Sequence, residues 1–136
     1  MDTLQAVKEK YAADNFPRSL GIELLELAPG YARVAMTLTE NMVNFHGIGH
    51  GGAIFTLADT ALGLASNSHG DPAVAISVTI NYLSPARAGT RLVAEAREEH
   101  LTRRTGVYRI TVNSSKGEAI AVVHGTVYRK DKITGS

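Results

Sequence analysis

The chain has 136 residues, of which 44% are hydrophobic and 20% are charged, and its formal net charge is +1. These values indicate one globular domain over residues 1–136 and give no global argument for binding nucleic acid or an anionic membrane. Cysteine is absent, which excludes a disulfide framework, a thiolate nucleophile and a cysteine-ligated zinc site.

The N-terminal decapeptide MDTLQAVKEK is charged and lacks the apolar core of a signal peptide. No later stretch reaches the ~20 apolar residues that a membrane span needs. We therefore expect a soluble protein of the cytoplasm without a membrane partner. Apolar residues recur at helical spacing from Leu4 to Tyr11, behind Asp2 or Thr3 as the N-cap, which predicts an N-terminal helix within 1–18.

Two strands are predicted after the segment FPRSLG, which breaks the N-terminal helix. The segments IELLELA and YARVAMTL flank Pro29 and Gly30, a pattern typical of two strands joined by a tight turn. A polar, glycine-bearing loop is expected from Thr39 to about His50. A long helix is predicted from residue 51 to about 68.

The remaining chain is mostly strand. AVAISVTINYL alternates in polarity, TRLVAEAREEHLTRR has a charged face, and GVYRITVNSS and EAIAVVHGTVYRK flank Lys116 and Gly117 as a hairpin. The tail DKITGS, residues 131–136, is expected to be frayed. Short connections favour antiparallel pairing, so we predict an α+β fold with one sheet.

The predicted helix at 51–68 is apolar over most of its circumference, which is typical of a buried helix. The simplest architecture is a curved antiparallel sheet wrapped around it. One stripe of the helix is small and polar, so that another backbone or a ligand could approach closely there. This stripe consists of Gly52, Thr56, Asp59, Thr60, Gly63, Ser66 and Asn67.

Asp59 is the only carboxylate in this helix. A buried ionised carboxylate without partners costs several kcal/mol, so it must be paired, hydrogen-bonded, protonated or facing a wet cavity. One interpretation is a structural carboxylate bonded to hydroxyls of a neighbouring strand. The other is catalytic, because the N–H groups of Gly51 and Gly52 at the positive end of the helix suit a carbonyl oxygen that becomes an oxyanion.

The spacing of these groups sets a geometric condition. Gly51 and Asp59 are eight residues apart, and their separation along a helix is ~12 Å, which an aspartate side chain cannot close. One substrate carbonyl can hardly meet both groups in a single chain. If both act in one reaction, Asp59 must come from a second subunit that faces the start of the helix.

The pattern Asn44-x-x-Gly47-x-x-His50-Gly51-Gly52-x-x-x-x-Leu57-Ala58-Asp59, followed by SVTINYLSPA, resembles the PaaI-like acyl-CoA thioesterases of the hotdog-fold superfamily. The agreement in element order runs from Leu20 to Lys130, without departure at the motif positions. The resemblance implies the hotdog fold and hydrolysis of a CoA thioester, of the phenylacetyl-CoA or hydroxyphenylacetyl-CoA type, to free acid and CoA. It implies no cofactor besides the CoA of the substrate. It also implies a homodimer with two shared sites, usually paired into a homotetramer.

The same resemblance implies roles for individual positions. Asp59 matches the catalytic carboxylate, acting as general base or as nucleophile. The amide of Gly51 matches the oxyanion-side donor. His50 and Asn44 match loop residues that shape the site and polarise the thioester carbonyl, and Ser77 falls where the family places a hydroxyl that positions the water.

Positive charge is concentrated in the second half of the chain. Residues 69–136 carry 10 basic and 6 acidic side chains, whereas residues 1–68 carry 4 basic and 7 acidic ones. The arginines there are candidates for the CoA phosphates, with solvated strand-end charges as the alternative for each. The resemblance favours the LTRRT and LSPAR segments. The expected substrate-binding residues are Arg103, Arg104, Thr105, Arg87 and Pro85.

Other kinds of site are less well supported. His46 and His50 would suggest a metal pair on a helix, but Gly47 and Gly49 disfavour a helix there and no third ligand is near, so we expect no metal site. Two alternatives to hydrolysis stay open. One is a hotdog dehydratase or hydratase that pairs His46 with Asp59, although the proline-rich sequence after the dehydratase histidine is absent and Leu64 stands where a hydratase motif needs histidine. The other is a non-catalytic acyl-CoA-binding sensor.

Overall fold

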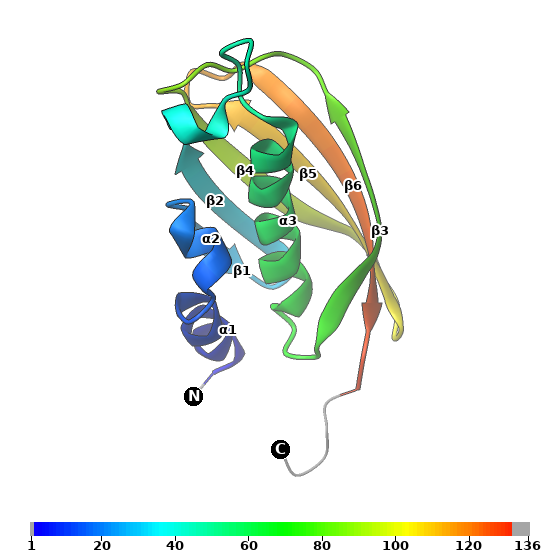
Figure 1. The fold of residues 1–136 in the computed structure, drawn as a ribbon. Helices are drawn as coiled ribbons and strands as arrows, with labels where there is room; N and C mark the ends of the chain where they lie inside the picture. Colours follow the sequence, from blue (N-terminus) through cyan, green and yellow to red (C-terminus); the bar gives the residue numbers. More distant parts are fainter. Residues whose placement is uncertain (1, 132–136) are drawn as a thin grey trace.

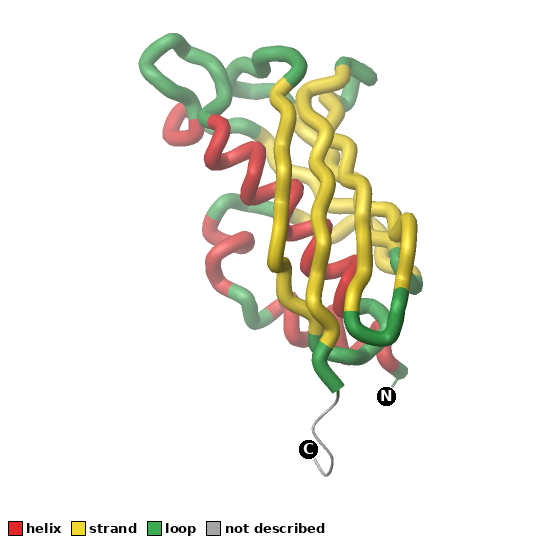
Figure 2. The backbone as a smooth tube through the Cα atoms, turned by 90° about the vertical axis from the view of Figure 1, so that its right-hand side faces the viewer, coloured by secondary structure: helices red, strands yellow, loops and turns green. Residues whose placement is uncertain are grey.

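The computed structural model describes residues 2–131 and consists of a bent sheet with one long helix across it (Figure 1). The elements are α1 (Thr3–Ala12), α2 (Asn15–Ser19), β1 (Glu23–Ala28), β2 (Tyr31–Thr37), the 3-10 helix η1 (Glu40–Met42), α3 (Gly51–Asn67), β3 (Ala73–Tyr82), β4 (Arg91–Leu101), β5 (Thr105–Ser114) and β6 (Ala119–Arg129). All strand pairs are antiparallel, in the order β1-β2-β4-β5-β6-β3. Figure 2 shows the sheet in front of the helix. The predicted α+β fold, a curved antiparallel sheet around a long helix, is confirmed.

The N-terminal segment differs from the single helix that we predict from the sequence. Asp2 is the N-cap of α1, and its carboxylate accepts a hydrogen bond from the N–H of Gln5 at 2.8 Å. The expected break at FPRSLG lies partly inside a second short helix, α2, because Pro17 is tolerated in the first turn of a helix. The expectation of a frayed tail falls, except for Asp131, outside the described residues.

The core lies between α3 and the concave face of the sheet. Buried side chains of α3 include Leu57, Ala61 and Leu62, which pack against buried residues of the strands. Gly125 on β6 permits this approach, because a Cβ atom at that position would lie 2.7 Å from a methyl carbon of Leu62. Glycine at this position therefore lets the helix approach the sheet closely.

The composition of α3 predicts a helix that is buried around most of its circumference. The structure shows that one face of α3 is open instead. Gly52, Asp59 and Gly63 are exposed, and Thr56 and Thr60 are half-buried. The sheet covers one side of α3, and the N-terminal helices cover only part of the other (Figure 1). Except for Ser66, which is buried, the stripe that the sequence marks as small and polar therefore lies on an open face of the single chain.

A hydrogen-bonded cluster fastens the C-terminal end of α3 to β4. The ring of His69 donates from Nε2 to Oε2 of Glu98 at 2.6 Å, and the buried hydroxyl of Tyr108 donates to the same oxygen at 2.8 Å. Partial burial alone would raise the pKa of Glu98, but these two hydrogen bonds and the nearby charges of His69 and Arg129 lower it overall. Glu98 thus stabilises the fold in its ionised form.

Glu98→Gln is expected to lower the free energy of unfolding at pH 7 by roughly 1–3 kcal/mol, because the two donors lose a charged acceptor. The folded pKa of Glu98 lies below the unfolded value, so its contribution is complete above the unfolded pKa and is lost as the pH falls through the folded pKa. Urea unfolding at pH 7 and pH 4 measures this, with exposed Glu99→Gln as the matched control. Equal pH dependence in wild type and Glu98→Gln would contradict the prediction.

Within residues 2–131, no helix is long and apolar enough to cross a membrane.

Candidate active site

Among the described residues, the backbone N–H groups at the start of α3 differ in whether they have a hydrogen-bond partner. His50 is the N-cap, and its ring Nδ1 accepts a hydrogen bond from the N–H of Gly52 at 3.2 Å. The N–H groups of Ala53 and Ile54 bind the carbonyl of His50, whereas the N–H of Gly51 has no hydrogen-bond partner within residues 2–131. The sequence predicts free N–H groups at both glycines. The prediction is correct for Gly51 and wrong for Gly52.

The hydrogen bond at Nδ1 also selects the tautomer of the neutral His50 ring. A neutral imidazole carries one proton, and Nδ1 acts here as the acceptor. The proton of the neutral ring is therefore on Nε2, which can donate to a ligand. His50 and the N–H of Gly51 are adjacent donors at the positive end of a 17-residue helix.

Tyr82, at the end of β3, holds the start of α3 in place. Its hydroxyl donates a hydrogen bond to the carbonyl of Gly51 at 2.8 Å. Its ring lies against the same residue, because a Cβ atom on Gly51 would be 2.9 Å from the Tyr82 hydroxyl oxygen. A side chain at position 51 would therefore displace the Tyr82 ring from the start of α3. Nothing in the local pattern of the SVTINYLSPA segment, which contains Tyr82, predicts this role.

Tyr82→Phe is expected to lower kcat about fivefold with KM little changed, because one hydrogen bond of about 1 kcal/mol to the helix start is lost. Steady-state kinetics and thermal unfolding of the variant measure the two effects separately. Tyr128→Phe on β6 is the control, since Tyr128 is also a partly exposed strand tyrosine. An unchanged kcat in Tyr82→Phe would show that the hydroxyl does not position the helix for catalysis.

The loop before His50 is closed by the side chain of Asn44. Its Oδ1 accepts hydrogen bonds from the N–H groups of His46 at 2.9 Å and Ile48 at 3.4 Å, and its own N–H binds the carbonyl of Ile48 at 2.8 Å. Asn44 therefore shapes the loop that leads to His50. Its expected role in polarising the thioester carbonyl stays a prediction. Only the amide nitrogen of the Asn44 side chain could donate the hydrogen bond that this role needs.

His46 lies at the tip of this loop. Its ring packs against that of Phe45, with 4.1 Å between the ring centroids. In the part of the chain that the structure describes, no group of three or more His, Asp or Glu side chains could hold a metal ion.

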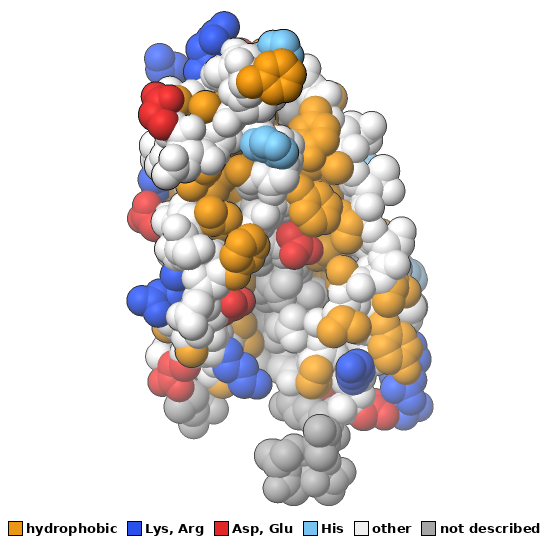
Figure 3. All heavy atoms as spheres, viewed as in Figure 1, with side chains coloured by type: hydrophobic (Ala, Val, Ile, Leu, Met, Phe, Trp, Pro, Cys, Tyr) orange, Lys and Arg blue, Asp and Glu red, His pale blue; other side chains and the backbone are white. Residues whose placement is uncertain are grey.

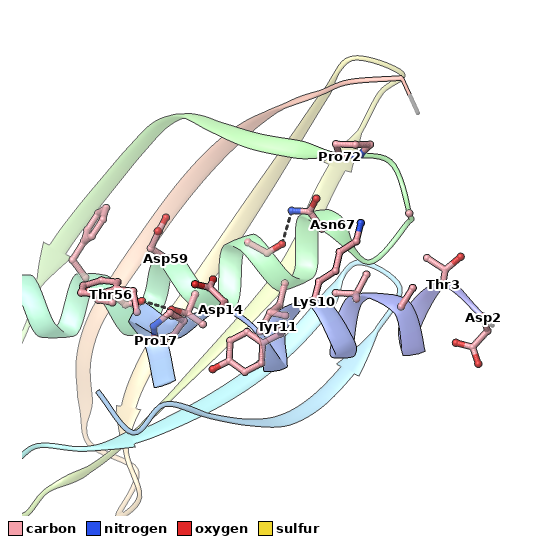
Figure 4. A pocket seen from close by; sticks show the side chains of 18 residues that line it. Asp2, Thr3, Lys10, Tyr11, Asp14, Pro17, Thr56, Asp59, Asn67 and Pro72 are labelled. Carbon is pink, nitrogen blue, oxygen red and sulfur yellow. Dashed lines mark hydrogen bonds between the residues drawn. The ribbon is translucent and has the colours of Figure 1, made fainter. Parts of the chain in front are cut away.

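Asp59 lies on the open face of α3, in the wall of a groove (Figure 4). The space-filling view shows this face hollowed between the N-terminal helices and β3, with hydrophobic side chains along it (Figure 3). The carboxylate has no hydrogen-bond or ion-pair partner in residues 2–131. Although the side chain is exposed in the single chain, partial burial raises its pKa above the ordinary value of 3.8. The structure therefore gives no support to a structural carboxylate bonded to strand hydroxyls.

The other predicted residues form two groups at opposite ends of the sheet. The backbone of Arg87 forms an isolated antiparallel β-bridge with Ile48, in the loop that leads to His50. Arg103 and Arg104 lie in the turn between β4 and β5, at the end of the sheet where α3 finishes (Figure 1). Their guanidinium groups are 3.9 and 3.4 Å from the carboxylate of Asp131.

Three further predicted residues lie near these groups or on β3. The Thr105 hydroxyl hydrogen-bonds that of Thr102 at 2.8 Å, and Pro85 is exposed near Arg87. Ser77 is exposed on β3, just after a register shift, and forms no side-chain hydrogen bond within residues 2–131. A single chain thus brings together His50 and Gly51 but not the complete predicted site.

Comparison with known proteins decides the class of this site. Residues 46–121, which include the loop tip, α3 and most of the sheet, match the model of the thioesterase superfamily. The chain belongs to the thioesterase superfamily. It is therefore an enzyme of the thioester hydrolase class, as the sequence motif predicts.

Individual members of the thioesterase superfamily agree with this assignment. The chain is 40% identical to the acyl-coenzyme A thioesterase PaaI of Escherichia coli, over 88% of this chain and 85% of the relative. The solved structure of the E. coli PaaI protein from the phenylacetic acid degradation operon is 38% identical, covers 94% of this chain and 93% of its own, and has a TM-score of 0.91. A Streptococcus mutans protein solved bound to acetyl CoA is 32% identical, with coverage of 82% and 90% and a TM-score of 0.79. The predicted hotdog fold and the resemblance to PaaI are confirmed.

Proposed function

We propose that the protein hydrolyses an acyl-CoA to a free acid and CoA, in sites shared between two copies of the chain. The observation that carries this proposal is that one helix presents a backbone N–H at Gly51 and a carboxylate of raised pKa at Asp59, neither of which has a partner within residues 2–131. The name of the E. coli relative and the acetyl CoA in the S. mutans structure support CoA thioesters as the substrate class.

The proposed chemistry uses these groups directly. The thioester carbonyl accepts hydrogen bonds from the Gly51 N–H and from Nε2–H of His50, which stabilise the negative charge on its oxygen during attack. Asp59 takes a proton from water as the oxygen of that water bonds to the carbonyl carbon. The C–S bond then breaks, and CoA leaves as a thiolate that needs little general-acid help. A raised pKa makes Asp59 a stronger base in its ionised form.

The free edge of β3 supports a shared site. β3 has ten residues and, in the part of the chain that the structure describes, pairs on one side only, with β6. It exposes large apolar side chains on and next to this edge, which an isolated protein would have to protect. These side chains are Val74, Ile76, Tyr82 and Leu83. We propose that two copies pair their β3 edges about a two-fold axis.

Such pairing would bring a Gly51 and an Asp59 from different chains together, although the two residues are ~12 Å apart within one helix. Two-fold symmetry makes the two copies of β3, and with them the two α3 helices, run in opposite directions. With the axis beside the first half of α3, the partner subunit's Gly51 would lie next to Asp59. Two equivalent sites per dimer follow, each with Asp59 from one chain and the helix start from the other.

Several finer points belong to the same proposal. The acyl group is of the phenylacetyl or hydroxyphenylacetyl type, by analogy with the E. coli relative from the phenylacetic acid degradation operon. Arg103 and Arg104 hold the CoA phosphates, the dimers associate into tetramers, and the enzyme works in the cytoplasm. No cofactor is needed besides the CoA of the substrate.

The alternatives require other arrangements. A dehydratase would pair a histidine with Asp59, but His46 packs on Phe45 at a loop tip. A sensor would need no water-activating carboxylate. The test is a panel of acyl-CoAs, from acetyl-CoA to phenylacetyl-CoA, assayed with a free-thiol reagent. Release of CoA is expected, whereas reversible hydration of an enoyl-CoA or binding without turnover would overturn the proposal.

A further inference from the structure

A long groove runs between the N-terminal helices and the open face of α3 (Figure 4). Its volume is about 1060 Å3. Asp59 and Thr56 lie toward one end of it and Pro72 toward the other (Figure 4). The groove is therefore continuous with the candidate active site and extends well past it.

Much of the groove lining is apolar. Its apolar side chains are Val7, Tyr11, Phe16, Pro17, Phe55 and Leu64. Phe16 is 63% exposed, so covering it with an apolar ligand would remove a large unfavourable surface from water. The N-terminal wall carries Asp2, Lys10 and Asp14, and with Asp59 these charges disfavour an anionic ligand. These features favour a hydrocarbon ligand.

The walls of the groove are fixed in position. The hydroxyl of Tyr11 donates to the carbonyl of Ile22 at 3.0 Å, which fastens α1 to the start of β1. At the far end, the side chain of Asn67 is bonded to both the N–H and the carbonyl of Ala73, at 3.0 and 3.2 Å. The groove is therefore a feature of the folded chain, with polar groups at its far end already satisfied.

Gly63 keeps the groove open beyond Asp59. A Cβ atom at this exposed position would meet no atom of residues 2–131 within 4 Å. From Asp59 to Asn67, α3 rises by ~12 Å, a length that a medium-chain alkyl group fills and a phenylacetyl group does not. Glycine is also a poor helix former, so its place in the middle of α3 costs stability without a packing reason in the single chain.

We propose that this groove holds the acyl chain of the substrate and that Gly63 admits straight medium-length chains as well as arylacetyl groups. The inference rests on the proposed function, since it assigns the rest of the same site. The partner subunit would approach along the β3 edge, and β3 and the N-terminal helices lie on opposite sides of α3 (Figure 1). The partner would then cover the groove at Asp59 and leave the part beyond Asp59 open to substrate.

The test compares acetyl-, phenylacetyl-, octanoyl- and decanoyl-CoA in wild type, Gly63→Ala and Gly63→Leu. The open space and the better helix propensity of leucine favour correct folding of the variant. Gly63→Leu is expected to lower kcat/KM at least tenfold for octanoyl- and decanoyl-CoA and less than twofold for acetyl-CoA, with Gly63→Ala between it and wild type. Light scattering checks that the oligomeric state is unchanged.

A second variant tests the opposite wall. Phe16→Ala is expected to raise KM for octanoyl-CoA several-fold and leave acetyl-CoA unaffected, whereas Leu25→Ala on β1 is the exposed apolar control outside the groove. The inference would be overturned if Gly63→Leu and Phe16→Ala both lowered kcat/KM equally for short and long acyl chains. It would also be overturned if neither variant lowered kcat/KM. Wild-type protein that releases no CoA from any substrate would instead overturn the proposed function.

Discussion

Asp59→Asn is expected to lower kcat for acyl-CoA hydrolysis by at least ~10², the usual scale for loss of a general base. The amide is nearly isosteric, and the Asp59 carboxylate has no protein partner among residues 2–131 that the change would strand. The fold and KM should therefore remain close to those of wild type. Steady-state kinetics with the best substrate of the acyl-CoA panel measure the effect.

The pH dependence provides a second measurement on the same residue. Burial raises the pKa of Asp59, and only the ionised form can accept a proton from water. In wild type, kcat/KM should rise with pH through an apparent pKa above 3.8. In Asp59→Asn this rise should disappear, whereas Glu99→Gln on β4 should retain it. Near-wild-type turnover by Asp59→Asn would show that the carboxylate is structural.

Replacing both Arg103 and Arg104 with alanine is expected to raise KM for acyl-CoA at least tenfold. Their side chains are 79% and 47% exposed, and their contacts with Asp131 are long, so both are free to bind phosphate. Charge-assisted hydrogen bonds to phosphate each contribute roughly 1.5–3 kcal/mol when well formed. The measurement is KM at two salt concentrations, for acyl-CoA and for a short acyl thioester that lacks the nucleotide.

The two substrates separate a CoA-binding role from a structural one. KM for the short thioester should change little in the double variant, and Arg97→Ala on β4 should leave both values unchanged. An equal increase in KM for both substrates would mean that the arginines support the structure. No loss on either would place the phosphate site elsewhere, with Arg87 and Lys116 as the next candidates.

Local patterns were sufficient to predict most of the fold. Polar and apolar residues alternate in most strands, so one face packs on the core. The structure places the strands within one residue of the predicted bounds, except that β4 ends at Leu101, three residues before the predicted end. Gly30 has a φ of +72° in the turn between β1 and β2, a conformation that glycine adopts without strain. The long helix ends at Asn67, one residue before the predicted end.

Contacts between distant segments could not be predicted in the same way. Tyr82 and Gly51 are 31 residues apart and meet only because β3 ends beside the start of α3. The bond from Gly52 to His50 depends on the rotamer of an N-cap ring, which no periodicity encodes. The open face around Asp59 could not be predicted for a different reason. The apolar composition of α3 suggests burial all round, but the cover on that face would come from outside the single chain.

Subunit complementation tests the shared site most directly. Asp59→Asn and Gly51→Val subunits, each inactive alone, are mixed in equal amounts, dissociated and re-associated, and native mass spectrometry shows the mixed dimers. In each mixed dimer one site would combine the intact Asp59 of one chain with the intact Gly51 of the other. Random pairing then predicts recovery of about a quarter of wild-type activity. No recovered activity in a sample with proven mixed dimers would contradict a site built from two chains.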